Sequence, residues 1–321
     1  MSFFEEVDFI TDTDISLLSE KRIESCLDNI FSSPHFIFAN HDLHPGYYVI
    51  RVRPDFMFND IIDIKELSYK PKHLNDSYQR ASTPNDTMLY CSSCERREAN
   101  IPFTDIEYGL NISLYETVKE LRDSFSNSEF SKSITYSIWV VKEPLRLARV
   151  ALYKNYYSPF NSPSQIMEEL HAYYTYHDSY MRLYDIEQRT KIIAYIDKFY
   201  YFLSNIFSSI PIDNRQYIIS ALASKSLCYK HGFNGISYPS VRKNGEGLNF
   251  AFPPCVVDEG LIYCVELGSF QLVYRDKKSY FENLTTHYKC EKNDISNDLS
   301  LLEKSIQNNK LNKKEIIQYP F

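Results

Sequence analysis

The stretch HGFNGISYPSVRKNGEGLNFAF, residues 231–252, decides the fold, because the chain changes there from helical to strand periodicity. Before it, residues 214–230 carry apolar side chains at helical spacing, and Gly232 suits the position just after a helix end. After Asn234 and Gly235, the segments 236–241 and 248–252 read as two strands. We therefore expect helices and strands in one chain.

Working outward, other segments show the same two periodicities. Residues 47–53 (YYVIRVR) alternate as a strand, which places Arg51 and Arg53 on one face. Strands are also expected at 88–92, 134–141 and 146–153, with a pair within 261–275. Helices are expected at 14–32, 113–125, 163–177, 188–207 and 295–306. Residues 54–89 have little periodicity and read as a long irregular stretch.

Composition excludes several classes of protein. The chain has 321 residues and a formal net charge of −7, so we expect no attraction to nucleic acid or to an anionic membrane. No apolar run has the length of a transmembrane helix, and the N-terminus is acidic where a signal peptide would be basic. The first residues read instead as a solvated acidic arm, with docking of a basic partner as the alternative. The odd number of cysteines, 7, favours a reducing compartment, and we expect the protein in the cytoplasm.

The chain lacks the common phosphate-binding and metal-binding motifs. Its 8 glycines form neither G-x-G-x-x-G nor G-x-x-x-x-G-K-[ST], so a phosphorylated ligand would have to be held by side chains, for which arginine is best suited. Cys91 and Cys94 form the only C-x-x-C, with no second ligand pair. We therefore expect no metal.

Four segments in order resemble the RES domain, a family named for its Arg, Glu and Ser. YYVIRVRP (47–54) and YQRASTPNDTMLY (78–90) are similar to its two arginine motifs, and NISLYETV (111–118) is similar to the stretch that supplies its glutamate. The segment 231–252, with its Y-P-S strand, is the closest match. The sequence has Ser82 where the family usually has asparagine.

The resemblance implies a fold related to ADP-ribosyltransferases, with a strongly bent mixed sheet and helices packed outside it. The corresponding domains are an N-terminal helical extension (1–45), a RES domain with a helical block at 160–210 (46–283), and a C-terminal tail (284–321). RES proteins are commonly toxins that split NAD at the nicotinamide–ribose bond, and a small helix-turn-helix antitoxin often neutralises them. NAD would then be the substrate, cleaved by hydrolysis or by phosphorolysis. Such an antitoxin would be a partner, which the acidic N-terminus could also dock, while self-association stays open.

The resemblance also assigns roles to individual residues. Breaking the glycosidic bond develops positive charge on the ribose, which a carboxylate can stabilise, and Glu116 is the candidate. Arginines can bind the pyrophosphate bidentately, and a hydroxyl can bind the ribose or a phosphate. The remaining candidates are Arg51, Arg80 and Ser240 for catalysis, with Arg53, Tyr90, Tyr238 and Asn249 for nucleotide binding.

Ordinary structural explanations remain for several of these residues. Arg51 and Arg53 could lie on a solvated sheet surface, and Glu116 could lie on a solvated helix face, with Glu95 and Glu107 as rivals. Two other functions also stay open. The protein could transfer ADP-ribose to a protein target, or it could be an inactive RES-like module that binds the nucleotide without cleaving it.

Overall fold

The computed structural model of the chain describes residues 1–14, 17–54, 67–94, 129–150, 178–179, 181–208, 216–239, 248–275 and 278–289. The chain divides into two compact units, which we treat separately. The first comprises Met1–Leu43, Lys70–Leu89 and Leu145–Pro254, and the second comprises His44–Tyr69, Tyr90–Pro144 and Cys255–Phe321. Helices occur together with both parallel and antiparallel strand pairs, so the predicted mixed α/β class is confirmed.

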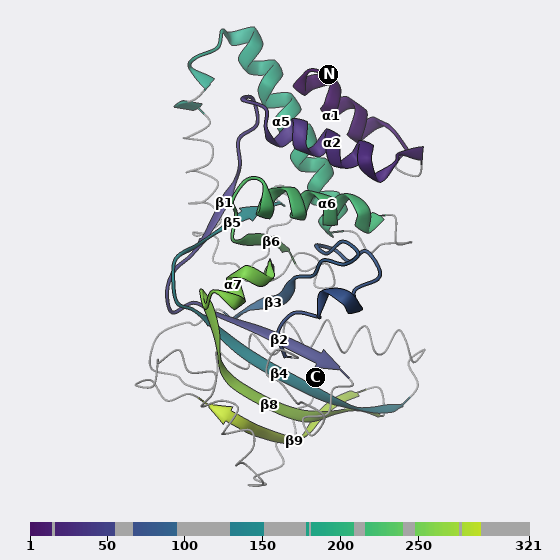
Figure 1. Cartoon of the computed structure of the whole chain (residues 1–321), viewed down its shortest axis with the longest axis vertical. Helices are drawn as coiled ribbons and strands as arrows, with labels where there is room; N and C mark the ends of the chain where they lie inside the picture. Colours follow the sequence, from purple (N-terminus) through teal and green to yellow (C-terminus); the bar gives the residue numbers. More distant parts are fainter. Residues whose placement is uncertain are drawn as a thin grey trace. The chain divides into compact units, whose positions relative to one another are not determined.

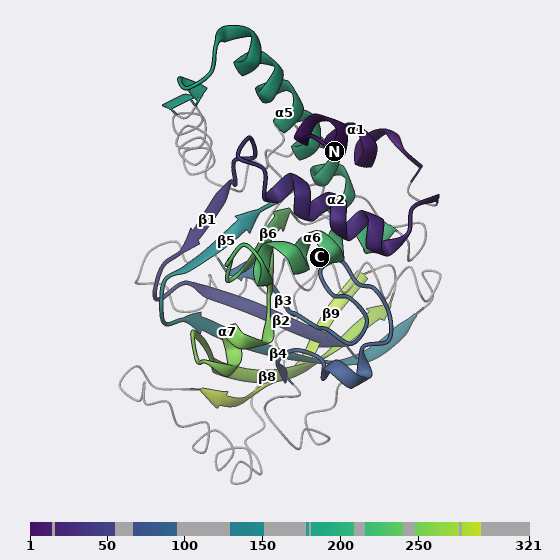
Figure 2. The same cartoon turned by 45° about the horizontal axis from the view of Figure 1, so that its top comes forward.

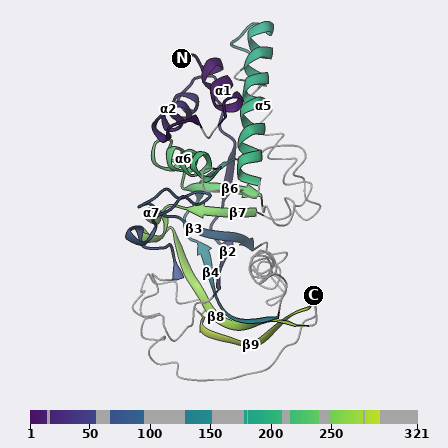
Figure 3. The ribbon, with the colours of Figure 1, turned by 90° about the vertical axis from the view of Figure 1, so that its right-hand side faces the viewer.

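Four strands of the first unit lie in the order β1-β5-β6-β7. They are β1 (Asn40–Leu43), β5 (Leu145–Arg149), β6 (Gly235–Pro239) and β7 (Leu248–Phe252). β5 and β6 are parallel, whereas β1–β5 and β6–β7 are antiparallel. Figure 3 shows the neighbouring strands β6 and β7 running in opposite directions. Gly235 is needed where β6 begins, because a Cβ there would lie 2.6 Å from the Ala251 carbonyl oxygen.

The helices of this unit are α1 (Phe3–Asp12), α2 (Glu20–Phe31), α5 (Ile186–Ser208) and α6 (Gln216–Tyr229). The predictions at 188–207 and 214–230 are confirmed by α5 and α6. Figures 1 and 2 show α1 and α2 lying together beside α5. No helix among the described residues combines the length and apolar character that a membrane crossing requires. The helices predicted at 113–125, 163–177 and 295–306 lie outside the described residues.

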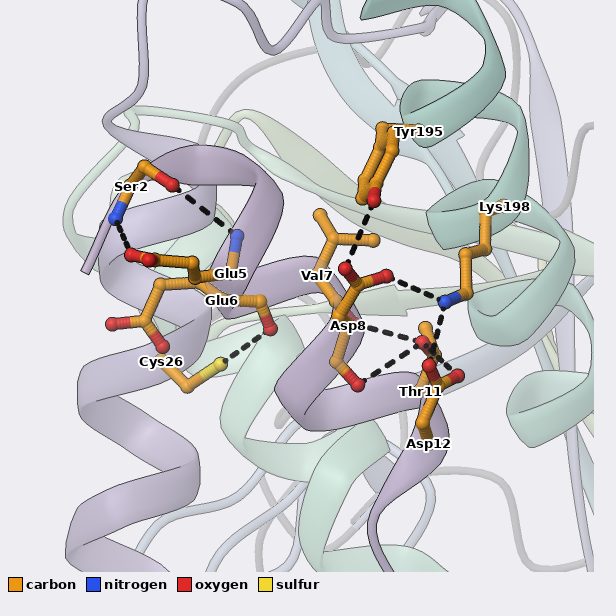
Figure 4. A network of polar contacts seen from close by, with 10 residues as sticks. All are labelled: Ser2, Glu5, Glu6, Val7, Asp8, Thr11, Asp12, Cys26, Tyr195 and Lys198. Atoms are coloured by element: carbon orange, nitrogen blue, oxygen red, sulfur yellow. Dashed lines mark hydrogen bonds and ion pairs between the residues drawn. The ribbon is translucent and has the colours of Figure 1, made fainter. Parts of the chain in front are cut away.

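The prediction for the N-terminus is wrong in two respects. The expected single helix at 14–32 begins at Glu20, because the Ser19 side chain accepts a hydrogen bond from the Arg22 amide and caps the helix there. The acidic segment expected to be a solvated arm forms the helix α1 instead, and its residues Val7 and Ile10 are fully buried. Acidic side chains hold α1 in place: Figure 4 shows Lys198 of α5 donating to Asp8 at 2.7 Å and to Asp12 at 2.9 Å.

The second unit carries the strand order β3-β2-β4-β8-β9. The strands are β2 (Tyr48–Pro54), β3 (Leu89–Cys94, in this unit from Tyr90 onward), β4 (Phe130–Val141), β8 (Ile262–Arg275) and β9 (Lys278–Lys289). Each of β2–β3, β2–β4, β4–β8 and β8–β9 is antiparallel. The short helix α7 (Pro254–Asp258) begins at the boundary of this unit. Figure 1 shows β4 and β8 curving along their length.

The prediction of two strands within 261–275 is wrong, because β8 is one continuous strand. Gly268 lies inside it rather than at a turn. A Cβ at Gly268 would lie 2.3 Å from the Tyr136 ring, so the glycine makes room for a large side chain on the neighbouring strand. On the side away from β4, β8 pairs with the antiparallel strand β9. This strand continues across residue 284, where the sequence suggests that the C-terminal tail begins.

Candidate functional site

The two arginines of β2 share one face of the second unit's sheet. Strand register places Arg51 opposite Ser137 of β4, and Arg53 opposite Thr135. Because side chains alternate along a strand, Ile50 and Val52 point to the other face, where Ile50 belongs to a buried apolar cluster. The two guanidinium groups therefore lie on the face opposite that cluster.

Hydroxyl groups accompany the arginines on this face. Ser93 of β3 pairs with Val49, which shares the face of Arg51, and Ser269 of β8 pairs with Thr135. We call this set the arginine face, and its members are Arg51, Arg53, Ser93, Thr135, Ser137 and Ser269. Ser93, Thr135 and Ser137 are buried, and the indole Nε1 of Trp139 donates to the Ser137 hydroxyl oxygen at 2.9 Å. Fixed cations and hydroxyls in such an arrangement suit an oxyanion ligand.

Arg51 is a desolvated cation on the arginine face. Burial, together with the positive charge of Arg53, lowers the pKa of Arg51 to about 10. Its Nη1 donates to the Tyr90 carbonyl oxygen at 3.1 Å, while its buried Nε has no hydrogen-bond partner among the described residues. A bound anion would stabilise a guanidinium in this environment, because the anion replaces the lost hydration and offsets the repulsion from Arg53.

The Tyr90 side chain lies on the other face of the sheet. Ser92 pairs with Ile50, and Tyr90 is two residues from Ser92, so its side chain shares the face of Ile50. The same face carries a buried carboxylate, Glu266, which accepts a hydrogen bond from the Tyr136 hydroxyl at 3.1 Å. Arg51 thus contacts the main chain of Tyr90, while the phenol is directed toward the face of Glu266.

In the first unit, Arg80 lies in a tight turn. Gln79 and Ser82 exchange main-chain hydrogen bonds at 2.9 and 3.4 Å, which places Arg80 and Ala81 at the tip. The Asn75 side chain steadies the loop by donating to the carbonyl oxygens of Thr83 and Asp86. The stretch 67–88 therefore has a defined conformation without strands, as its sequence predicts.

Arg80 reaches the last turn of α5. Its Nη1 donates to the carbonyl oxygens of Ile206 and Phe207, which lie where a helix leaves its final carbonyls without internal partners. A positive charge at a helix C-terminus is also favourable. The Arg80 guanidinium therefore contributes to stability, whatever else it binds.

Tyr238 and Asn249 are paired in the β6–β7 ladder, on one face of the first unit's sheet. The Tyr238 ring packs against Phe207 with 5.7 Å between ring centroids, so Phe207 links Tyr238 to the carbonyl that Arg80 binds. The structure thus brings Arg80, Tyr238 and Asn249 together within this unit. Arg51, Arg53 and Tyr90 belong to the second unit.

The remaining predicted residues, Glu116 and Ser240, lie outside the described part of the chain, as do Glu95 and Glu107. Among the described residues, no group of three or more histidine, cysteine, aspartate or glutamate side chains could hold a metal ion. Cys91 is a buried free cysteine, and burial raises its pKa.

Sequence reasoning missed Glu266 and the hydroxyls of the arginine face. Glu266 has a detectable signal in the sequence. It is the one acidic residue in the largely apolar stretch 261–275 (LIYCVELGSFQLVYR), whose only other charged residue is the terminal arginine. Such a residue, when buried, needs a partner. Thr135, Ser137 and Ser269 have no comparable signal, since strands commonly carry serine and threonine.

Comparison with known proteins adds no assignment: no protein-family model matches the chain, and a search of the curated proteins finds no relative.

Proposed function

We propose that the protein binds NAD and cleaves its nicotinamide–ribose bond, as the resemblance to the RES domain implies. The observation that supports this proposal best is the arginine face, with two neighbouring guanidinium groups and a row of hydroxyls. In a chain without a glycine-rich phosphate loop, such a face is the means by which a pyrophosphate can be held.

The charges of the arginine face match a dinucleotide. A pyrophosphate carries two negative charges in close succession, and Arg51 and Arg53 are two residues apart on one strand face. Guanidinium groups bind phosphate oxygens through paired N–H donors. The lowered pKa of Arg51 supports this role, because a desolvated cation is stabilised by an anionic ligand.

The chemistry needs a carboxylate near the ribose, and we assign this role to Glu116. The bond between ribose C1′ and the nicotinamide nitrogen breaks, its electron pair leaves with neutral nicotinamide, and a carboxylate stabilises the ribosyl cation. Water then adds to C1′ and releases a proton, which gives ADP-ribose. In this proposal Arg51 and Arg53 bind the pyrophosphate. Ser240 keeps the role that the resemblance implies, as do Arg80, Tyr238 and Asn249 of the first unit. The Tyr90 side chain is left out, because it lies on the face of the sheet opposite Arg51 and Arg53.

The test is nicotinamide release from NAD by the purified protein, followed by chromatography. We expect wild type to release nicotinamide and Glu116→Gln to lose nearly all activity. Arg51→Lys keeps the charge but loses the paired donors. A charge-assisted hydrogen bond contributes roughly 1.5–3 kcal/mol, so KM should rise on the order of 10- to 100-fold.

Arg146→Gln is the matched control, because it removes an exposed positive charge outside the proposed site. It should leave activity unchanged. Activity of Glu116→Gln equal to wild type would overturn the role of Glu116, and absence of both binding and cleavage would overturn the function. Labelled ADP-ribose appearing on a protein would favour the transferase alternative, and binding without nicotinamide release would favour an inactive module.

The biological part of the proposal follows from the same resemblance. An enzyme that depletes NAD is toxic in the cytoplasm, and a helix-turn-helix antitoxin would hold it inactive. Expression in cells should therefore lower the NAD pool and arrest growth, and Glu116→Gln should do neither.

A further inference from the structure

Three polar residues meet on the sheet of the first unit, and the proposed function uses none of them. Arg149 of β5 pairs directly with Ser237 of β6, and Ser237 pairs with Phe250 of β7. His41 of β1 pairs with Leu147, two residues from Arg149, and its ring lies 5.7 Å from the Phe250 ring centroid. We call His41, Arg149 and Ser237 the polar row.

All three residues lie on one face of the sheet. Residues paired across a ladder share a face, and so do residues two positions apart on a strand. Tyr238 and Asn249 are adjacent in sequence to Ser237 and Phe250, so their side chains lie on the opposite face. The polar row is therefore separate from the residues that the resemblance assigns to nucleotide binding.

The polar row is buried. His41 and Arg149 are each only 8% exposed, and Ser237 is fully buried. Neither the Nδ1 of His41 nor the hydroxyl of Ser237 has a hydrogen-bond partner among the described residues. Burying polar atoms in this way is unfavourable, and buried polar atoms without a partner point to a bound water, ion or ligand.

The charge of the polar row identifies the class of ligand. Arg149 is a buried cation. Burial of His41, together with the positive charge of Arg149, lowers the pKa of His41 to about 3, so the imidazole is neutral at neutral pH. The row then offers a guanidinium, a hydroxyl and one imidazole nitrogen, beside the apolar wall of Phe250. These groups favour a small anion with several acceptor oxygens, and they disfavour a cation.

We propose that the polar row is a second ligand site, which binds a small oxyanion of the phosphate class through Arg149 and the Ser237 hydroxyl, with His41 beside it. The proposal uses the position and charge of Arg149 and the unsatisfied atoms of the other two residues. A buried water bridging His41 and Ser237 is the competing explanation, because a water can satisfy both groups without any anion.

Inorganic phosphate is the probe, and calorimetric titration at pH 7 is the first measurement. Because phosphate could also bind the arginine face, the titration is repeated with Arg51→Ala, in which binding to the polar row should persist. In that background Ser237→Ala should weaken phosphate binding about tenfold or more, and Arg149→Met should abolish it. Arg146→Gln, which removes a positive charge from the other face of β5, should bind phosphate as its parent does.

A second measurement needs no substitution in the polar row. Phosphate added to protein labelled in its histidine rings should shift the imidazole resonances of His41, and acetate should shift them less if several oxygens are required. Loss of all phosphate binding in Arg51→Ala would overturn the proposal, as would unchanged His41 resonances at saturating phosphate. Either result would assign the unsatisfied atoms of the polar row to buried water.

Discussion

Acid should destabilise the first unit through one residue, His41. Burial and the charge of Arg149 lower its pKa from 6.5 to about 3. The unfolded chain therefore binds a proton near pH 6.5, whereas the folded chain does not bind it until about pH 3. The stability that depends on neutral His41 is fully present above pH 7 and is lost progressively as the pH falls from about 6.5 to about 3.

The expected size follows from this displacement. At pH 5 the pH is about 1.5 units below the pKa of the histidine in the unfolded state, and each such unit stabilises the protonated unfolded state by about 1.4 kcal/mol. The free energy of unfolding should therefore fall by about 2 kcal/mol between pH 7 and pH 5 from this residue alone. The assay is urea denaturation followed by the helical circular dichroism signal, because α1, α2, α5 and α6 all belong to this unit. Phosphate-free buffer is needed, since an anion beside His41 would raise its pKa.

The comparison with His41→Gln isolates the effect from other titrating groups, including His231, whose pKa burial also lowers. The variant has no imidazole at this position, so its stability should fall by about 2 kcal/mol less than that of wild type over the same interval. His44→Gln, which removes an exposed imidazole nearby in sequence, is the matched histidine-to-glutamine control and should be as stable as wild type at pH 7. Equal losses in wild type and His41→Gln would refute the reasoning.

Three further substitutions test the packing. Gly268→Ala should destabilise the second unit by about 2–4 kcal/mol, because the new Cβ would lie 2.3 Å from the buried Tyr136 ring. Denaturation monitored by Trp139 fluorescence measures this loss. In the double variant with Tyr136→Ala, part of the loss caused by Gly268→Ala should disappear. Tyr200→Phe should lower the free energy of unfolding by about 1–3 kcal/mol, because the buried hydroxyl accepts a hydrogen bond from the Ala39 amide and donates one to the Ile37 carbonyl oxygen, both at 2.9 Å. A loss no larger than that caused by Tyr201→Phe, at an exposed position, would contradict this prediction. Arg80→Gln should lower the midpoint of urea unfolding by the equivalent of about 1 kcal/mol, and Arg80→Lys by less, because lysine keeps the favourable charge at the end of α5.

Local periodicity was enough to predict helices, whose main-chain hydrogen bonds lie within the segment, and short strands with a regular side-chain pattern. The helices α5 and α6 and the strands β2, β6 and β7 lie within a few residues of their predicted positions. The errors occur where a distant contact decides the local structure. Gly268 suggests a break in the sequence, but it continues a strand because Tyr136 of β4 occupies the space above it. The acidic N-terminus suggests a solvated arm, but Lys198 of α5 forms ion pairs with two of its carboxylates.

The same distinction applies to the candidate sites. Alternation along 47–53 predicts that Arg51 and Arg53 share a face, but the hydroxyls beside them come from β3, β4 and β8, and only the register of those strands reveals them. The polar row is harder still to predict, because His41, Arg149 and Ser237 each stand alone in a strand of its own. No spacing within one segment can indicate such a cluster. What identifies it is burial together with two polar atoms, the His41 Nδ1 and the Ser237 hydroxyl, that have no hydrogen-bond partner among the described residues. This property exists only once three strands are aligned.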